Sequence, residues 1–542
     1  LFNFCAIILN VIDTLYYPFS KNRFTISFIN EFSNENNITS FIMRFGLDYW
    51  YVIPIIIATI YILRYISNIT LSQQDVIYNF KNLPISIVIT ITIFILTIFG
   101  CRGSFIYKNR PITISNAGKY ANNPNEISLI INTPFSLLRT AHIKDLKKRK
   151  FFTEEDLNKI YNIKHHYNDT VLNKKNIIII ILESMGMEYY GAYNNTNSYT
   201  PFLDSLINHS YSSYNSFSNG KKSIDAMPAI LASIPNTNFH FSLSKYTTNA
   251  IQGIGSLLES EGYTTSFFHG APNGSMGFES MANLCGIKNY YGMNEYNNNK
   301  DFDGLWGIWD DKFFNYFGNK LNLMKEPFFS GFFSCSSHHP YKIPEGYKKS
   351  FKEGKHPMHK CVQYTDYSLQ QFFKQIKDEK WYNNTLFVIT ADHTNISFDK
   401  KYKTSIGIFR VPIIFFDPSD NKKRLYKSEK IIQHIDILPS ILSYIGYNKP
   451  FISFGNNLFD LEENNFSINY HNDYQLIIDD KLIIYNESND KITKVYNFKN
   501  DQLLKNNIIK DIDPDILEKY KKKIYAFIQN YNNRMINNNL KL

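Results

Sequence analysis

Two of the most apolar segments of this chain end in side chains that can bind a metal. Five isoleucines and a leucine in residues 176–182 lead directly to Glu183, and residues 385–391 lead to Asp392 and His393. If both segments are parallel strands, their carboxyl ends meet at one edge of a sheet, where ligands bind. A single glutamate at a strand end is most often solvated, but the Asp-His pair favours a shared ion. Carboxylate oxygens with an imidazole nitrogen suit Mn²⁺ or Zn²⁺ and, less well, Mg²⁺.

A candidate nucleophile follows a Gly-Lys-Lys turn. Ser223 comes directly after Lys221 and Lys222 and begins an apolar helical pattern, SIDAMPAILASIP. A hydroxyl at the N-terminus of a helix lies near the positive end of the helix dipole, and a metal lowers its pKa further. The alternative is that Ser223 is only the N-cap of this helix. The two lysines either attract a phosphate or form a solvated turn.

The segments that would carry these residues alternate between strands and helices. Helical patterns such as residues 200–210 and 364–378 separate short, continuously apolar runs. Strands of this kind form parallel sheets that are covered on both faces. We therefore expect an α/β fold with a mostly parallel sheet flanked by helices. The apolar runs are NIIIIILE, TTSFFHG, PFFSGFFS, TLFVITADH and VPIIFFD.

The first 110 residues have a different composition. Residues 48–67 and 83–100 have the length and apolarity of membrane-spanning helices, and the second of these segments carries no charge. Residues 1–17 resemble the end of a further span, and we expect that the chain lacks residues upstream of it. Buried core helices are the less favoured alternative. Lysine and arginine flank the spans on both sides, so the positive-inside rule does not give their orientation.

These patterns predict four parts. Their expected roles are transmembrane helices, incomplete at the N-terminus, in residues 1–110, a connector in 111–172, an α/β domain that is the candidate catalytic domain in 173–465, and a C-terminal hairpin and helix that complete it in 466–542. In the connector, residues 144–162 form a charged, partly amphipathic pattern, and Thr153 supplies a helix start. Residues 474–485 predict a hairpin. An Asp-Pro pair at residues 513–514 predicts the start of an amphipathic helix.

Charge and cysteine content limit the functional classes. The formal net charge of +10 is spread along the chain, which suits anionic surfaces such as lipid head groups. We find no basic stripe with spaced aromatic residues and expect no nucleic-acid partner. The five cysteines contain no CxxC pair. A disulfide framework is therefore excluded, and unpaired or buried thiols are preferred over a single disulfide.

An ordered set of short motifs resembles the lipoteichoic acid synthase-like phosphoglycerol transferases, membrane members of the alkaline phosphatase and sulfatase superfamily. One such motif is a weak signal, whereas the ordered set over residues 176–460 is a strong one. The motifs are ILES, TPFLDSL, GKKSIDAMPAI, WGIWDDKFF, SSHHPY, YTDYSLQQFF, ADH, HIDILPSIL and FGNNLF. The resemblance implies a multi-pass protein of the cell membrane whose catalytic domain lies outside the cytoplasm.

The resemblance also implies roles for individual residues. Ser223 corresponds to the nucleophile, which is threonine in many members and is also a metal ligand. His338, in a His-x-Pro-aromatic segment, corresponds to a head-group ligand, and His269 to a position near the substrate. One divalent ion is expected, Mn²⁺ before Mg²⁺ or Zn²⁺. The remaining ligands of that ion correspond to Glu183, Asp392 and His393.

The implied reaction moves a phosphoglycerol-type head group from a phospholipid to a hydroxyl of a glycan or glycolipid, through a phospho-serine intermediate. Other members have a Trp-Asn-Arg segment that grips the glycerol phosphate. Here residues 277–280 are Gly-Phe-Glu-Ser, without an arginine, which leaves the head group open.

Four alternatives follow. A phosphoethanolamine transferase is expected to contain more disulfides. A sulfatase needs Cys or Ser followed by x-Pro-x-Arg, which residues 223–227 lack. A sulfatase-like phosphodiesterase or sulfuric ester hydrolase without transfer stays open. A degenerate, non-enzymatic membrane protein is disfavoured by the intact set of ligands and nucleophile.

Overall fold

The structure is a computed structural model, and internal contacts divide it into two compact units, Leu1–Asp145 and Leu146–Leu542. The second unit contains both strand ends that carry the predicted metal ligands. The residues that the structure describes are 4–11, 13, 49–70, 83–102, 120, 130–140, 146–167, 171–194, 198–420, 426–460 and 465–542.

The second unit is built on an eight-stranded sheet with the order β5-β4-β6-β2-β7-β8-β3-β9. β2 lies in the middle and pairs in parallel with β6 and β7. β8 runs antiparallel to both of its neighbours, and the other pairs are parallel. The prediction of a mostly parallel sheet is therefore confirmed, with the VPIIFFD run as its antiparallel member. The strands are β2 (Asn176–Leu182), β3 (Tyr211–Phe217), β4 (Thr264–His269), β5 (Asn289–Tyr291), β6 (Phe328–Phe333), β7 (Thr385–Ala391), β8 (Ile413–Phe416) and β9 (Tyr426–Gln433).

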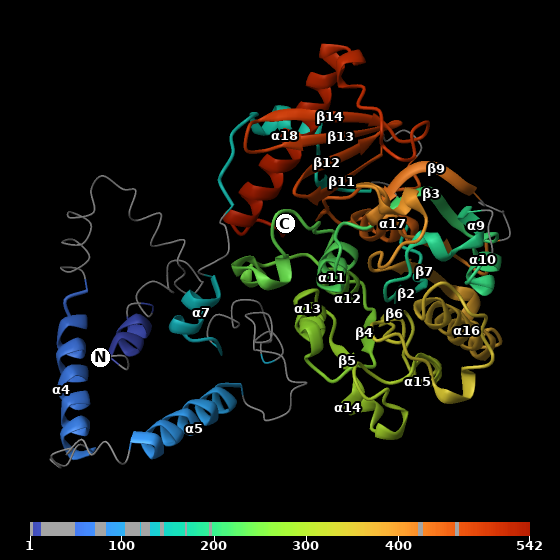
Figure 1. Ribbon diagram of the computed structural model, residues 1–542. Coiled ribbons are helices and arrows are strands. Elements are labelled where there is room, and N and C mark those ends of the chain that lie inside the picture. The colour runs from blue at the N-terminus through green and yellow to red at the C-terminus, as the bar shows by residue number, and fades with distance from the viewer. Residues whose placement is uncertain are drawn as a thin grey trace. The chain divides into compact units, whose positions relative to one another are not determined.

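Helices cover both faces of this sheet, which explains the isoleucine run. Successive side chains of a strand point to opposite faces, so β2 must be apolar at every position. Ile177, Ile179 and Ile181 enter one hydrophobic core, and Ile178, Ile180 and Leu182 enter another. All are fully buried, which stabilises the fold by about 1.5–3 kcal/mol for each side chain. Figure 1 shows α11, α12 and α13 on one side of the sheet and α15 and α16 on the other.

The flanking helices vary from one turn to five. The longest, α16, buries a stripe of apolar residues against α15 and the sheet. The helices are α9 (Gly191–Asn194), α10 (Pro201–Ile207), α11 (Ser223–Ala232), α12 (Ile254–Glu259), α13 (Phe278–Leu284), α14 (Met293–Tyr296), α15 (Asp310–Leu321), α16 (Met358–Ile376) and α17 (Ile437–Tyr444).

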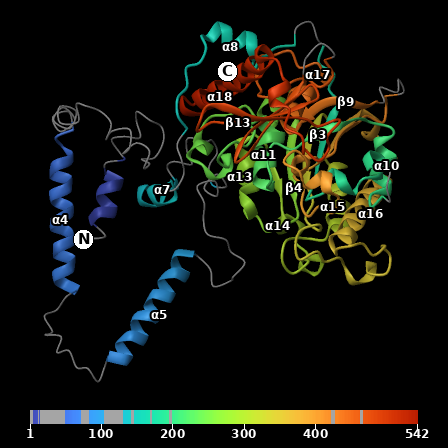
Figure 2. The ribbon, with the colours of Figure 1, turned by 45° about the horizontal axis from the view of Figure 1, so that its top comes forward.

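A second, antiparallel sheet and a long helix complete this unit. The predicted hairpin is present as β12 and β13, in a sheet of order β11-β12-β13-β14. α18 begins after Asp513, whose side chain accepts the N–H of Asp515, so the predicted cap is confirmed. In Figure 2 the red helix α18 lies against β13, and its residues join the same core as β2. The elements are β11 (Phe466–His471), β12 (Asp473–Ile478), β13 (Lys481–Asn486), β14 (Lys491–Asn497) and α18 (Pro514–Ile536), with β1 (Lys164–His165) paired to β10 (Phe451–Ile452).

The connector helix is shorter than the pattern over residues 144–162 predicts. α8 spans only Glu154–Ile160, although its predicted cap, Thr153, is in place. Residues 146–152 are not helical. Two of their backbone N–H groups donate to Gln529 Oε1 in α18, at 2.6 and 2.9 Å. The backbone of this stretch therefore finds its partners in α18 instead of in a helix of its own.

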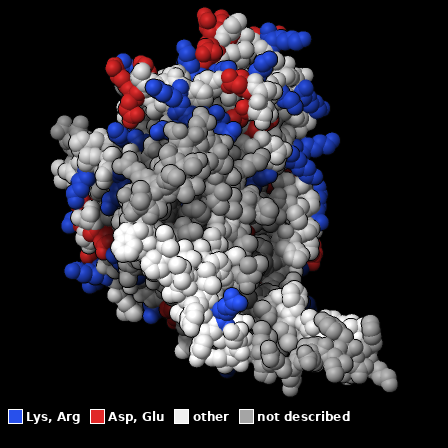
Figure 3. Space-filling view, turned by 90° about the vertical axis from the view of Figure 1, so that its left-hand side faces the viewer, with Lys and Arg blue, Asp and Glu red and all other residues white. Residues whose placement is uncertain are grey.

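Long apolar helices dominate the first unit. α4 (Val52–Thr70) and α5 (Leu83–Arg102) each contain 18 residues apolar enough to cross a membrane. Within the described part of the chain nothing buries these two stretches. Figure 3, which faces the side of these helices, shows a broad white surface with little charge. Residues 4–11 and 13 are also helical, and the rest of the third predicted span, residues 1–17, lies outside the described residues, as does part of the stretch before α7 (Thr133–Thr140).

Candidate metal centre and active site

Three of the four predicted metal ligands meet at the carboxyl ends of β2 and β7. Glu183 follows β2 and Asp392 follows β7, and the two strands stay paired up to Leu182 opposite Ala391. His393 Nε2 lies 3.1 Å from Asp392 Oδ2 and 3.7 Å from Glu183 Oε1. One ligand atom from each residue lies within 4.8 Å of the others. Distances of this size allow one cation to contact all three.

The hydrogen bonds of Asp392 leave one oxygen for a cation. Its Oδ1 accepts the backbone N–H groups of Ser184, at 2.7 Å, and of His393, at 2.8 Å. Its Oδ2 is buried and accepts no hydrogen bond from any described residue. Burial and then the negative charge of Glu183 raise the pKa of Asp392. A divalent ion would relieve both effects, so these residues fit a metal.

His393 balances the charge of the two carboxylates. Burial alone would raise the pKa of Glu183, but His393 and then other neighbouring groups hold that pKa below its usual value. Burial opposes a positive charge on His393, yet Asp392 and Glu183 raise its pKa. Its Nδ1 lies 2.7 Å from the carbonyl oxygen of Thr394, which makes Nδ1 the donor. Nε2 therefore faces the carboxylates and is free to bind a metal.

Ser223 is the first residue of α11. Lys222 occupies the N-cap position and makes no side-chain capping hydrogen bond. Ser223 Oγ instead donates to Glu183 Oε2, at 3.1 Å, and lies 3.3 Å from His393 Nε2. The alternative that Ser223 is only an N-cap is therefore wrong. Its hydroxyl lies at the metal centre and at the positive end of a ten-residue helix.

The two predicted substrate histidines lie at or beyond the carboxyl ends of β4 and β6, which are neighbours in the sheet. His269 ends β4, and burial lowers its pKa to about 4, against the opposing charge of Glu183, so its ring is neutral. Its Nδ1 lies 3.3 Å from the hydroxyl of Tyr290. His338 is half-buried after β6, and its ring centroid lies 3.7 Å from that of Trp306. Both imidazoles lie close enough to Glu183 to interact with it electrostatically.

Residues that the sequence analysis did not single out hold the ligands in place. The backbone N–H of Glu183 donates to Ser334 Oγ at 2.9 Å, and Ser337 Oγ donates to the carbonyl oxygen of Glu183. Asp310 accepts the backbone N–H groups that follow Ser334, and so fixes the loop that carries His338. Ser337 lies in the SSHHPY motif and Asp310 in the WGIWDDKFF motif, whereas Ser334 lies in neither, and spacing alone does not show which of these residues contacts Glu183.

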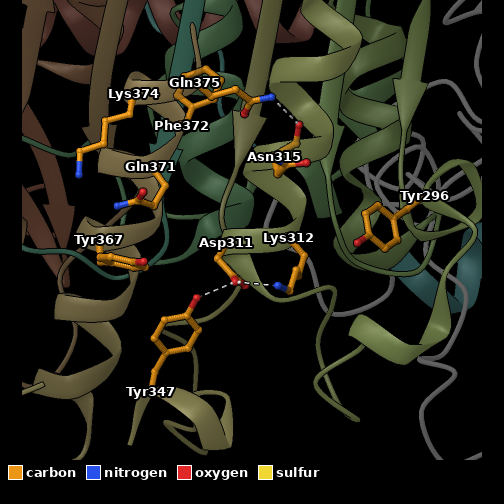
Figure 4. A pocket seen from close by; sticks show the side chains of 10 residues that line it. All are labelled: Tyr296, Asp311, Lys312, Asn315, Tyr347, Tyr367, Gln371, Phe372, Lys374 and Gln375. Carbon is orange, nitrogen blue, oxygen red and sulfur yellow. Dashed lines mark hydrogen bonds and ion pairs between the residues drawn. The ribbon is translucent and has the colours of Figure 1, made fainter. Parts of the chain in front are cut away.

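The cavity in Figure 4 is a different site. It measures about 600 Å³ and lies between α15 and α16. Within it, the hydroxyl of Tyr347 donates to Asp311, and Gln375 donates to the backbone of Asn315. None of the predicted site residues lines it. The remaining lining residues are Tyr296, Lys312, Tyr367, Gln371, Phe372 and Lys374.

A profile of the sulfatase family matches residues 175–447, which include Glu183, Ser223 and the Asp392-His393 pair. The chain belongs to the sulfatase family. Among curated proteins, lipoteichoic acid synthase 1 of Bacillus subtilis is 24% identical over 479 residues, which cover 82% of this chain and 73% of that protein. Lipoteichoic acid synthase of Staphylococcus aureus is 23% identical over 94% of this chain and 80% of that protein. The match to the lipoteichoic acid synthase-like YvgJ of Bacillus subtilis, 24% identical, covers 54% of this chain and only 51% of that relative.

Solved structures agree on the fold. A protein of the alkaline phosphatase superfamily from Vibrio parahaemolyticus superposes with a TM-score of 0.59 and 21% identity, over 72% of this chain and 94% of the other. Lipoteichoic acid synthase LtaP from Listeria monocytogenes superposes with a TM-score of 0.59 and 19% identity, over 71% of this chain and 99% of the other. This sulfatase-family chain is thus an enzyme of the alkaline phosphatase and sulfatase superfamily, distantly related to lipoteichoic acid synthases, and the resemblance seen in the sequence is confirmed.

One part of this sulfatase-family site departs from the pattern expected for a phosphoglycerol transferase. Phe278 occupies the stretch where a Trp-Asn-Arg segment is expected. It is buried, and its ring centroid lies 4.7 Å from that of His269. A buried aromatic side chain therefore occupies the stretch in which the resemblance implies an arginine.

Proposed function

We propose that this protein is a membrane-anchored, metal-dependent phosphotransferase. It moves a phosphoglycerol-type head group from a phospholipid to an acceptor hydroxyl on a glycan or glycolipid. The observation that carries the proposal is the position of Ser223 Oγ, between Glu183 Oε2 and His393 Nε2 at the start of α11. A hydroxyl in such a place can act as a nucleophile toward phosphorus.

The residues of the chain divide the reaction into two steps. Ser223 Oγ bonds to phosphorus as the bond to the lipid glycerol breaks, and diacylglycerol leaves with the proton that Ser223 gives up. The acceptor oxygen then bonds to phosphorus, the bond to Oγ breaks, and the proton of the acceptor hydroxyl returns to Ser223. A divalent cation held by Glu183, Ser223, Asp392 and His393 would activate the hydroxyl and neutralise charge on the phosphoryl oxygens.

The neighbouring residues support binding of a head group. His338 is half-exposed on the face of Trp306 and can donate a hydrogen bond to a head-group oxygen. His269 is buried and neutral, so it offers a hydrogen bond rather than a charge. α4 and α5 would keep this centre close to its lipid donor, and we place the catalytic domain on the outer side of the cytoplasmic membrane.

Trapping the intermediate tests the proposal. The purified full chain with Mn²⁺ is mixed with vesicles of phosphatidylglycerol or of phosphatidylethanolamine, quenched in acid, and analysed by peptide mass spectrometry. We expect glycerol phosphate on Ser223 and no adduct in Ser223→Ala. An ethanolamine phosphate adduct on Ser223 would show that the transferred head group is phosphoethanolamine and not phosphoglycerol. Release of the head group without any adduct would show that the protein hydrolyses the lipid directly and does not transfer the group through Ser223.

A further inference from the structure

Two lysines precede the proposed nucleophile, and the ammonium group of each lies within hydrogen-bond distance of a histidine ring nitrogen. Lys221 Nζ lies 2.8 Å from Nδ1 of His471, at the end of β11. Lys222 Nζ lies 3.4 Å from Nε2 of His240, in the loop that follows α11. The two contacts differ in whether a carboxylate fixes the position of the histidine.

His240 is fixed by a buried carboxylate on the same helix as the nucleophile. Its Nδ1 lies 2.6 Å from Oδ1 of Asp225, a side chain with 1% exposure. A carboxylate only accepts, so Nδ1 carries the proton and Nε2 offers a lone pair to the ammonium group. Asn236 donates to the other oxygen of Asp225 at 3.3 Å. A Cβ at Gly220 would lie 2.2 Å from Cβ of Asp225, so the loop before Ser223 is shaped around this carboxylate.

The chemistry at Ser223 calls for a second positive charge. In phosphoryl transfer, negative charge spreads over several oxygens, and two-metal enzymes place an ion on each side. Among the described residues, one group of three or more His, Cys, Asp or Glu side chains can hold a metal, namely Glu183, Asp392 and His393. One cation leaves part of the phosphoryl charge without a partner, and the nearest fixed ammonium by sequence is Lys222.

We propose that Lys222 binds a non-bridging oxygen of the phosphoryl group, and that Asp225 and His240 are positioning residues that hold its ammonium group there. The inference deepens the proposed function and rests on it for the identity of the substrate. The binding of phosphate itself, however, needs neither a lipid donor nor an acceptor. Lys221 is the matched control, because it has the same charge one residue away but lacks a carboxylate-fixed partner.

Binding of inorganic phosphate to the Mn²⁺-loaded full chain, measured by calorimetry, tests this assignment. A lost hydrogen bond from a charged group corresponds to about a tenfold or greater rise in Kd, which we expect for Lys222→Ala. Lys221→Ala should change Kd less than about twofold, as a solvated surface charge does. Equal effects of the two variants, or no phosphate binding by the wild type, would overturn the assignment.

A double-mutant cycle tests the positioning role. If His240 acts through Lys222, His240→Ala should weaken phosphate binding, and the double variant should be no weaker than Lys222→Ala alone. His240→Gln offers an amide oxygen to the ammonium and should recover most of the binding. Thermal melts identify any variant that loses its fold. If His240→Ala is unfolded, phosphate binding by His240→Gln is compared with that of the wild type instead. Additive losses, or failure of Gln to recover binding in a folded protein, would show that His240 does not act through Lys222. Loss of lipid transfer with intact phosphate binding would instead count against the proposed function alone.

Discussion

Buried carboxylates serve opposite purposes in two regions of this molecule. On the α16 side of the sheet, Asp366 accepts the backbone N–H groups of Phe202 and Leu203, at 3.0 and 2.9 Å, and so caps α10. At the metal centre, Asp392 also accepts two backbone N–H groups, but its Oδ2 is buried and faces His393 and Glu183. Both side chains are almost inaccessible to solvent.

The difference shows where this fold gives up stability for function. Both oxygens of Asp366 are used on the backbone of a helix start, where a missing partner costs free energy. The carboxylates of Asp392 and Glu183 instead lie close together, and their mutual repulsion destabilises the folded state until a cation binds. Substitutions of Asp392 or Glu183 should therefore remove function without unfolding the protein, whereas substitutions of Asp366 should lower stability without removing function.

Replacing Ser223, the proposed nucleophile, should give the largest effect. We expect Ser223→Ala to lower the rate of head-group transfer by at least about 10³-fold, because the attacking oxygen is lost. The melting temperature should hardly change, since Ser223 makes no capping hydrogen bond. Ser223→Thr keeps the hydroxyl and should retain measurable transfer. Full activity in a folded Ser223→Ala protein would remove the covalent mechanism. Transfer of a radiolabelled head group is the measurement.

Replacing a ligand carboxylate should remove metal binding without loss of stability. Asp392→Asn keeps the size of the side chain but removes one of two adjacent charges. We expect Mn²⁺ affinity to fall more than about 100-fold in calorimetry, beyond the loss typical of residues that only support a ligand. In EDTA the variant should melt at the same temperature as the wild type or higher. Asp366→Asn is the control and should bind Mn²⁺ normally.

Replacing the supporting carboxylate should do the opposite. Asp366→Ala leaves the N–H groups of Phe202 and Leu203 without their acceptor inside the fold, and should lower the free energy of unfolding by about 2 kcal/mol. Mn²⁺ affinity and transfer by the folded fraction should stay near the wild-type values. Urea unfolding monitored by fluorescence gives the first quantity and calorimetry the second. A variant as stable as the wild type would show that the cap of α10 does not matter.

The sequence predicted the strands that are buried on both faces. β2, β6 and β7 are mostly apolar because helices cover each side of them, and β4 ends in an apolar Phe-Phe pair. β3 was not predicted, because its sequence, YSSYNSF, is polar. One of its buried serines, Ser213, finds a backbone partner on β9, because its Oγ donates to the carbonyl oxygen of Ser428 at 2.9 Å. Such pairing over more than 200 residues leaves no local signal.

The same distinction holds at the site. The meeting of Glu183 with Asp392 and His393 follows from the rule that parallel strands end at one edge, so strand patterns were enough. The pairing of Asp225 with His240 was not predicted, since it depends on the path of the loop after α11. The contact of Lys221 with His471 depends on how the C-terminal sheet packs, which no motif encodes.

Stabilisation of the fold by the metal should also depend on pH. In the metal-free protein the pKa of Asp392 is raised to about 7. The folded state therefore holds this proton more tightly than the unfolded state, and its stability falls as the pH rises through that value. The metal-bound protein needs Asp392 ionised and His393 neutral, and His393 also has a raised pKa. Stabilisation by Mn²⁺ should therefore grow from pH 5.5 to pH 8, by up to about 1.4 kcal/mol per pH unit for each proton released.

Melting curves with Mn²⁺ and with EDTA at several pH values measure this growth. Glu183 has a lowered pKa, so it is ionised over the whole window and adds no slope of its own. Asp366→Asn should show the same growth as the wild type, because Asp366 binds backbone and not the ion. Asp392→Asn should show no Mn²⁺ stabilisation at any pH. If the stabilisation by Mn²⁺ stays constant or decreases with rising pH, no proton leaves Asp392 or His393 when the ion binds. The contrast between Asp366 and Asp392 would then rest on their hydrogen bonds alone.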